Sequence, residues 1–160
     1  PSDEDKMRRL FYQFSDENKY FRYFARIRIM PHREMQNYVN IDYKTTLSIV
    51  GVLERNRVET IIAEARYSYY PEEDVYEMAF TVDEKHQGRG IGTFLLDYLI
   101  MIAHERGIKK LTANILYENS RMIRVFDKAR VKPVTSFDSG IVVKLFHLDE
   151  LDTEGNSNEK

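Results

Sequence analysis

The chain has 160 residues, of which 42% are apolar and 31% are charged, a composition typical of one folded globular domain. Its 24 lysines and arginines nearly balance 26 aspartates and glutamates, so the strong basic charge of a nucleic-acid-binding protein is missing. The absence of cysteine excludes disulfides, cysteine-ligated metals and thiol nucleophiles, and no apolar run reaches the roughly 18 residues that cross a membrane. We therefore expect a cytoplasmic protein whose partners are neither nucleic acid nor membrane.

These features predict a single domain over residues 1–148. Residues 149–160 contain five acidic residues and one basic residue among small polar ones, which predicts a disordered acidic tail. Because the chain begins at Pro1 and not at a methionine, we expect a domain excised from a longer multidomain protein. The four histidines are too widely spaced for a metal site, so none is expected.

The first third of the chain is predicted to be helical. Leu10 and Phe14 belong to an apolar stripe at helical spacing, Ser15 is suited to cap a second helix, and Pro31 is suited to open a third. The densest basic cluster falls in this part and predicts a solvated helix face in preference to a phosphate site; it consists of Arg22, Arg26, Arg28 and Arg33.

Three β-branched, alternating segments follow. They predict strands at 47–53, 59–69 and 75–82, joined by a turn at 54–57 and a loop at 71–74. Because both connections are short, neighbouring strands are expected to pair antiparallel as a meander.

The remainder predicts a helix at 93–106 ended by Gly107, a strand at 108–116, a helix to Ala129 capped by Asn119 or Ser120, and a strand at 141–148. The expected fold class is α/β in the broad α+β sense. Its mixed central sheet begins with an antiparallel meander and is flanked by helices.

The most informative segment is the glycine-rich loop at 87–92, Gln-Gly-Arg-Gly-Ile-Gly, between the third strand and the long helix. Unpaired N–H groups at a helix start attract anions, and glycines let the backbone approach them, so the loop is expected to cradle a phosphate. The dinucleotide motif would need glycine at Thr93, and no P-loop lysine follows. Both of those motifs also belong to parallel βαβ units, which the meander is not.

The pattern that does match is Q/R-x-x-G-x-G/A, formed by Gln87, Gly90 and Gly92. With the meander before it and the Asn119 helix after it, residues 47–129 resemble the Gcn5-related N-acetyltransferase (GNAT) superfamily. The resemblance implies the GNAT fold and acetyltransferase activity with acetyl-CoA as co-substrate. Residues 18–24 and 40–43 further resemble bacterial protein lysine acetyltransferases, which modify AMP-forming acyl-CoA synthetases.

The resemblance also implies roles for individual residues. The backbone at Phe80 and Val82 would pair with the pantetheine arm of acetyl-CoA, and the Val82 N–H would donate to the thioester carbonyl. Asn119 would bond the pantetheine arm, and Phe126 would line the thioester end. The pyrophosphate would be held by backbone N–H groups of the loop, namely Gln87, Gly88, Arg89, Gly90, Ile91, Gly92 and Thr93.

Deprotonation of a lysine amine near neutral pH needs a base. We predict Glu77 in the third strand, where these acetyltransferases carry a glutamate, with Glu64 on the neighbouring strand as the reserve. Many GNAT enzymes carry a tyrosine that protonates the leaving thiolate at the position where this chain has Phe126. Here either Tyr117 or solvent would supply that proton, or the thiolate would leave without one. Two alternative functions stay open: acetylation of a small amine, and acyl-CoA sensing without catalysis.

Overall fold

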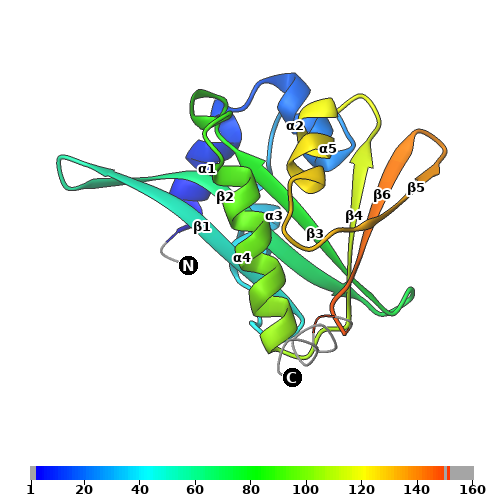
Figure 1. Cartoon of the computed structure of the whole chain (residues 1–160). Helices are drawn as coiled ribbons and strands as arrows, with labels where there is room; N and C mark the ends of the chain where they lie inside the picture. Colours follow the sequence, from blue (N-terminus) through cyan, green and yellow to red (C-terminus); the bar gives the residue numbers. More distant parts are fainter. Residues whose placement is uncertain (1–2, 150, 152–160) are drawn as a thin grey trace.

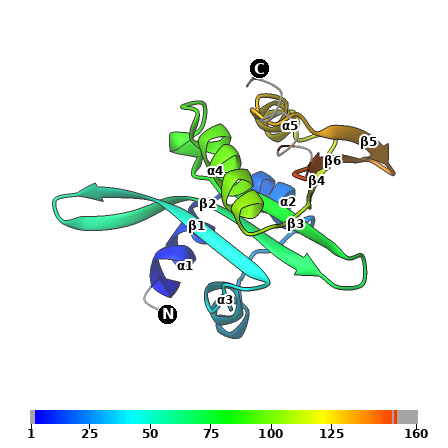
Figure 2. The same cartoon turned by 60° about the horizontal axis from the view of Figure 1, so that its bottom comes forward.

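The computed structural model describes residues 3–149 and 151. Within them, one six-stranded mixed sheet has the order β1-β2-β3-β4-β6-β5, with helices on both faces (Figures 1 and 2). This arrangement confirms the predicted fold class. The strands are β1 (Thr46–Arg55), β2 (Val58–Tyr70), β3 (Val75–Val82), β4 (Lys110–Leu116), β5 (Val134–Asp138) and β6 (Ile141–His147). The helices are α1 (Glu4–Gln13), α2 (Asp16–Tyr23), α3 (His32–Val39), α4 (Ile91–Glu105) and α5 (Ser120–Asp127), with a short 3₁₀ turn, η1 (Glu84–His86).

Local sequence signals account for several helix boundaries. The Ser15 hydroxyl accepts the Asn18 N–H at 3.2 Å and starts α2, as predicted. Pro31 precedes the first residue of α3, where its fixed φ suits helix entry. Gly107 follows α4 with φ +75°, a conformation that terminates helices and favours glycine.

The predicted meander is confirmed by the antiparallel pairs β1–β2 and β2–β3. The β1–β2 turn is tighter than expected: Asn56 and Arg57 alone form it, with φ of +51° and +63°. A bulge interrupts the pairing between Gly51 and Val52, so Gly51 lies opposite Ala63 while Val52 lies opposite Ile61.

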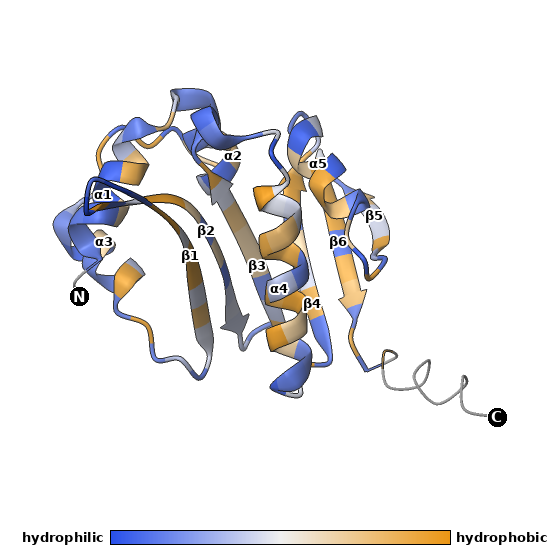
Figure 3. Ribbon diagram, turned by 60° about the vertical axis from the view of Figure 1, so that its left-hand side comes forward, coloured by the Kyte–Doolittle hydropathy of each residue, from blue (hydrophilic) through white to orange (hydrophobic). Residues whose placement is uncertain are grey.

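Apolar residues pack on both faces of the sheet. On one face, α4 buries Leu95, Leu96, Leu99, Ile100 and Ala103 against the strands in the larger core cluster (Figure 3). On the other face, a smaller cluster joins α1 and α3 to Ile61 of β2. The larger cluster fixes the start of α4 against the sheet, which is where the glycine-rich loop ends.

Strand β4 pairs with β3 over only two positions. The parallel pairs are Tyr76 with Leu111 and Glu77 with Thr112, after which the strands diverge (Figure 1). The backbone of β3 beyond Glu77 therefore has no strand partner on that side among the described residues.

The fold differs from the sequence prediction in two further places. Strand β5 was not predicted, because all five of its residues are exposed on an edge strand and lack the apolar face that marks most strands. Leu151 packs against the larger core cluster, beyond the predicted domain end at residue 148. The rest of the predicted tail, residue 150 and residues 152–160, lies outside the described residues. No helix of the described part is long and apolar enough to cross a membrane.

Candidate active site

A cleft of about 980 Å³ opens where β3 and β4 diverge. Its wall is formed by α2, the second half of β3, the glycine-rich loop, the start of α4, the end of β4, and α5. The cleft therefore brings together segments that lie far apart in the sequence, and most of the predicted site residues are among them.

The glycine-rich loop ends in a helix start with free donors. Gly90 caps α4 with φ +83°, a value that side-chain-bearing residues rarely adopt. The first backbone bond returning to this cap is from the Phe94 N–H to the Gly90 carbonyl, at 3.0 Å. The N–H groups of Ile91, Gly92 and Thr93, all residues of the cleft wall, are thus the donors of the first helical turn.

Two residues of the loop, Gln87 and Arg89, do not present a free backbone N–H to the cleft wall as predicted. The Gln87 N–H donates to the Glu84 carbonyl at 3.3 Å, so it is already engaged. Its side-chain amide donates to the Val82 carbonyl at 3.0 Å and accepts from Arg121 at 3.4 Å, which ties the end of β3 to α5. Arg89 is exposed and is not among the residues that line the cleft.

The register of β3 determines which backbone groups face the cleft. The Asp83 N–H donates to the Ile62 carbonyl of β2 at 2.7 Å. Because bonding alternates along an antiparallel pair, Thr81 and Ala79 also bond β2, while the N–H and C=O groups of Phe80 and Val82 point away from it. This is the orientation that pairing with an extended pantetheine arm requires.

Asn119 and Phe126 both line the cleft, as expected. The Asn119 side-chain oxygen accepts the Met122 N–H at 3.1 Å and caps α5, so its amide NH₂ is the group that can donate into the cleft. Phe126 is 1% exposed and meets Phe80 edge to face, with ring centroids 5.5 Å apart. The predicted thioester end is therefore apolar.

Glu77 is half-buried in the cleft wall, at the last paired position of β3 and β4. Burial raises the pKa of the Glu77 carboxyl above its ordinary value. A hydrogen bond with Asn114 of β4 lowers this pKa, the negative charge of Glu73 raises it, and the positive charge of Arg22 of α2 lowers it. A carboxylate whose pKa is raised binds a proton more strongly, which suits a general base.

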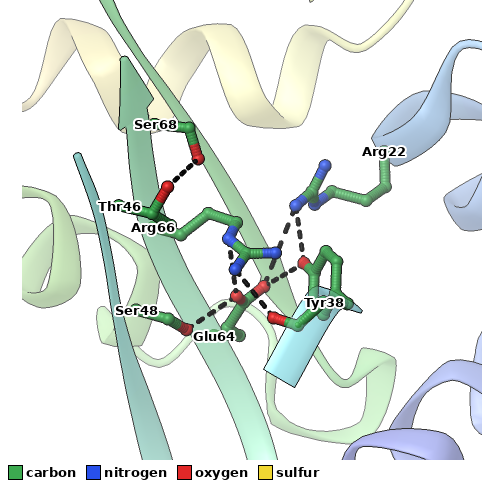
Figure 4. A network of polar contacts seen from close by, with 7 residues as sticks. All are labelled: Arg22, Tyr38, Thr46, Ser48, Glu64, Arg66 and Ser68. Atoms are coloured by element: carbon green, nitrogen blue, oxygen red, sulfur yellow. Dashed lines mark hydrogen bonds and ion pairs between the residues drawn. The ribbon is translucent and has the colours of Figure 1, made fainter. Parts of the chain in front are cut away.

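The reserve candidate Glu64 has a different environment. It is 0% exposed, does not line the cleft, and both of its oxygens are occupied (Figure 4). Oε1 accepts from Ser48 at 2.8 Å, and Oε2 accepts from the Tyr38 hydroxyl at 2.5 Å. Glu64 is therefore the centre of a buried network rather than a group open to a substrate.

The predicted solvated helix face is wrong, because Arg26 and Arg28 lie between α2 and α3, Arg33 lies on α3, and Arg22 is not exposed. Arg26, Arg28 and Arg33 are exposed, but the Arg22 side chain is only 13% exposed and lines the cleft. Local sequence gave no signal for this difference, because the groups that hold Arg22 come from α3 and β2.

Comparison with known proteins agrees with this geometry. The acetyltransferase (GNAT) family model matches residues 6–130. The chain belongs to this family. It is 32% identical over 143 residues to the acetyltransferase Pat of Mycolicibacterium smegmatis, covering 88% of this chain and 41% of that protein.

Solved structures agree as well. The GNAT domain of S. lividans PAT superposes with a TM-score of 0.80 at 28% identity, over 91% of this chain and 85% of that one. A cAMP-binding acyltransferase from Mycobacterium smegmatis gives a TM-score of 0.57 at 30% identity, over 86% of this chain and 42% of that one. The chain thus spans less than half the length of Pat and of that acyltransferase.

The chain has Phe126, not a tyrosine, at the position where many GNAT enzymes carry a proton-donating tyrosine. Tyr117 is 65% exposed, packs edge to face with Phe137, and does not line the cleft. Among residues 3–149 and 151, no group of three His, Asp or Glu side chains is arranged to hold a metal ion.

Proposed function

We propose that this GNAT domain transfers an acetyl group from acetyl-CoA to a lysine amine of a protein, with Glu77 as the general base. The observation that carries the proposal is the position of Glu77, a half-buried carboxyl in the cleft wall where β3 leaves β4. The relatedness to Pat and to the PAT domain supports a protein acceptor. An AMP-forming acyl-CoA synthetase is the acceptor that the resemblance of residues 18–24 and 40–43 favours.

Binding would use backbone groups of the cleft. The N–H groups of Ile91, Gly92 and Thr93 would hold the pyrophosphate, aided by the positive end of α4. The backbone groups of Phe80 and the N–H of Val82 would pair with the pantetheine arm, while the Val82 carbonyl is held by the Gln87 side chain, and the Asn119 amide would donate to the arm. Together these contacts would fix the thioester within reach of Glu77.

The chemistry needs a base and a donor to the carbonyl oxygen. Bound acetyl-CoA would supply the acetyl carbon that the amine attacks and the sulfur that leaves. Glu77 would take the proton of the amine, whose ordinary pKa is about 10.4, directly or through water. The Val82 N–H would donate to the oxygen that gains negative charge. A C–N bond forms, a C–S bond breaks, and the thiolate takes a proton from solvent, since Phe126 has none to give.

The test is acetyl transfer to a purified AMP-forming acyl-CoA synthetase, followed by intact-protein mass spectrometry. We expect addition of one acetyl group, and a loss of about 10²–10⁴-fold in turnover for Glu77→Gln with acetyl-CoA affinity unchanged. Glu105→Gln, at an exposed position of α4, is the matched control and should keep full turnover.

Other results would redirect the proposal. Full turnover in Glu77→Gln would remove Glu77 from the mechanism. Acetylation of a small polyamine but not of the synthetase would favour a small-amine enzyme. Measurable acetyl-CoA binding without transfer to either acceptor would favour a sensing domain.

A further inference from the structure

A buried polar cluster lies between the sheet and helices α2 and α3 (Figure 4), and one of its members, Arg22, lines the cleft. Its centre is Glu64, whose Oε1 is 3.4 Å from Nε of Arg66 and whose Oε2 is 3.8 Å from Nη2 of Arg22. The cluster thus holds two guanidinium groups and one carboxylate. Because arginine stays ionised in proteins, one positive charge in the cluster is left uncompensated.

Tyr38 fixes the position of Arg22. Its hydroxyl accepts a hydrogen bond from Nη2 of Arg22 at 2.7 Å and donates one to Glu64 at 2.5 Å. Burial raises the pKa of Tyr38 well above its ordinary value, although Arg22 opposes the shift, so the hydroxyl keeps the proton that it donates. The Arg22 guanidinium also lies over the ring of Tyr23, 5.1 Å from its centroid.

The two arginines of the cluster have different surroundings, and only Arg22 faces the cleft. Arg66 donates to the Tyr38 carbonyl at 2.9 Å, stacks on the Tyr38 ring at 3.8 Å, and does not line the cleft. The Nε atoms of both arginines are buried without a hydrogen-bond partner among the described residues, but only Arg22 lines the cleft. Arg22 is therefore the member of the cluster that can act on groups in the cleft.

The groups that face Glu77 are few. Across the sheet, Ser68 of β2 is its neighbour, and Asn114 of β4 hydrogen-bonds its carboxyl. Glu73, in the loop before β3, repels the charge on Glu77, and Arg22 of α2 attracts it. Glu17 of α2 lines the same cleft. Among the groups that shift the pKa of Glu77, Arg22 is the cation, and its attraction offsets the repulsion by Glu73.

We propose that Arg22 is a positioning residue of the acceptor site: Tyr38 and Glu64 fix its guanidinium in the cleft wall, where its charge favours the ionised form of Glu77 and the neutral form of the attacking amine. Both forms are the reactive ones, since Glu77 must accept a proton and the amine must offer a lone pair. A nearby cation disfavours protonation of each. The inference rests on the proposed role of Glu77 as the base.

The decisive measurement is the titration of the Glu77 carboxyl by carbon-13 NMR, with its resonance assigned by its loss in Glu77→Gln. We expect Arg22→Gln to move the midpoint to higher pH by about 0.5 to 1 unit, the size expected when one attracting charge in the same cleft wall is removed at intermediate dielectric. Arg22→Lys keeps the charge and should shift the midpoint less. Arg26→Gln, which removes an exposed arginine near α2, is the matched control and should leave it unchanged.

Turnover provides a second readout. For Arg22→Gln, the rising limb of the kcat/KM profile should move to higher pH by the same amount as the carboxyl midpoint, with acetyl-CoA affinity unchanged. A purely structural role would lower activity equally across the profile and leave the limb in place. If Arg22→Gln does not fold, Tyr38→Phe frees the guanidinium without removing its charge and should shift both readouts in the same direction by a smaller amount.

Each negative result has one meaning. An unshifted midpoint in folded Arg22→Gln, or an equal shift in Arg26→Gln, would overturn the role of Arg22 while leaving Glu77 as the base. Full turnover in Glu77→Gln would overturn the base and this inference together.

Discussion

The two faces of β2 are both buried, one by apolar packing and the other by polar contacts. Toward α4, Ala63, Ala65 and Tyr67 pack into the larger apolar cluster and are 0% exposed. Toward α2 and α3, Glu64 and Arg66 are buried almost as completely, at 0% and 9% exposed, but by polar contacts. The apolar face holds the fold together, while the polar face places charge beside the cleft. Stability and electrostatics are thus separated on one strand.

The largest effect is expected from breaking the polar face at its centre. Glu64→Gln would leave two buried arginines without a carboxylate, which costs about 3–5 kcal/mol in the free energy of unfolding. Urea denaturation measures this, with exposed Glu105→Gln as the control at less than about 0.5 kcal/mol. A loss below about 1 kcal/mol would mean that water screens the cluster as it does a surface ion pair.

Breaking the apolar face should affect stability alone. Leu99 is 0% exposed in α4, so Leu99→Ala should cost about 3 kcal/mol in urea denaturation. Because Leu99 belongs to the opposite cluster, the carbon-13 titration midpoint of Glu77 should stay unchanged. A shifted midpoint would show that the two faces are coupled.

A smaller effect is expected where the glycine-rich loop meets α4. Gly90→Ala would force a side chain into φ +83° and cost about 1 kcal/mol, with realignment of the first-turn N–H groups. Calorimetry should show acetyl-CoA binding weakened about 10-fold.

Gly140→Ala is the matched control for the loop. Its φ of +85° is nearly the same, and it too has open space around the added atom, but it lies in the β5–β6 turn. Gly140→Ala should therefore lose as much stability as Gly90→Ala but should bind acetyl-CoA with unchanged affinity. Equal binding losses in both variants would argue against a direct role of the loop.

The smallest effect concerns Glu77 and depends on pH. Burial raises the pKa of Glu77 in the folded protein, so its contribution to stability is full at low pH and is lost as the pH rises through that pKa. Glu77→Gln avoids this loss and should raise stability at pH 7 by less than about 1 kcal/mol, since the group is only half-buried. Thermal unfolding at pH 7 and below pH 4 checks this. A gain that persists at low pH would mean that ionisation is not its cause.

Much of the site could be predicted because it depends on local signals. The glycines of the loop, the cap at Asn119 and the alternation of β3 are each visible in a short stretch of sequence, and all three recur in the cleft wall. The side-chain contacts of Gln87 could not be predicted from the sequence, because its partners Val82 and Arg121 come from β3 and α5. The position of Arg22 could not be predicted, since an arginine on an isolated helix gives no sign of what will cover it.

The sequence by itself determined the order of the helices and of every strand except β5, the meander, and the chemistry of the loop at the start of α4, because spacing, caps and turns act over a few residues. Tertiary structure alone decided which polar residues are buried. The bulge near Gly51 puts Ile61 in the α1–α3 cluster and Ala63 in the α4 cluster, although simple alternation would place both on one face. Only when α2 and α3 close over that second face do Glu64 and Arg22 become a buried charged pair beside Glu77, because the effect of a charge depends on neighbours that the chain supplies from a distance.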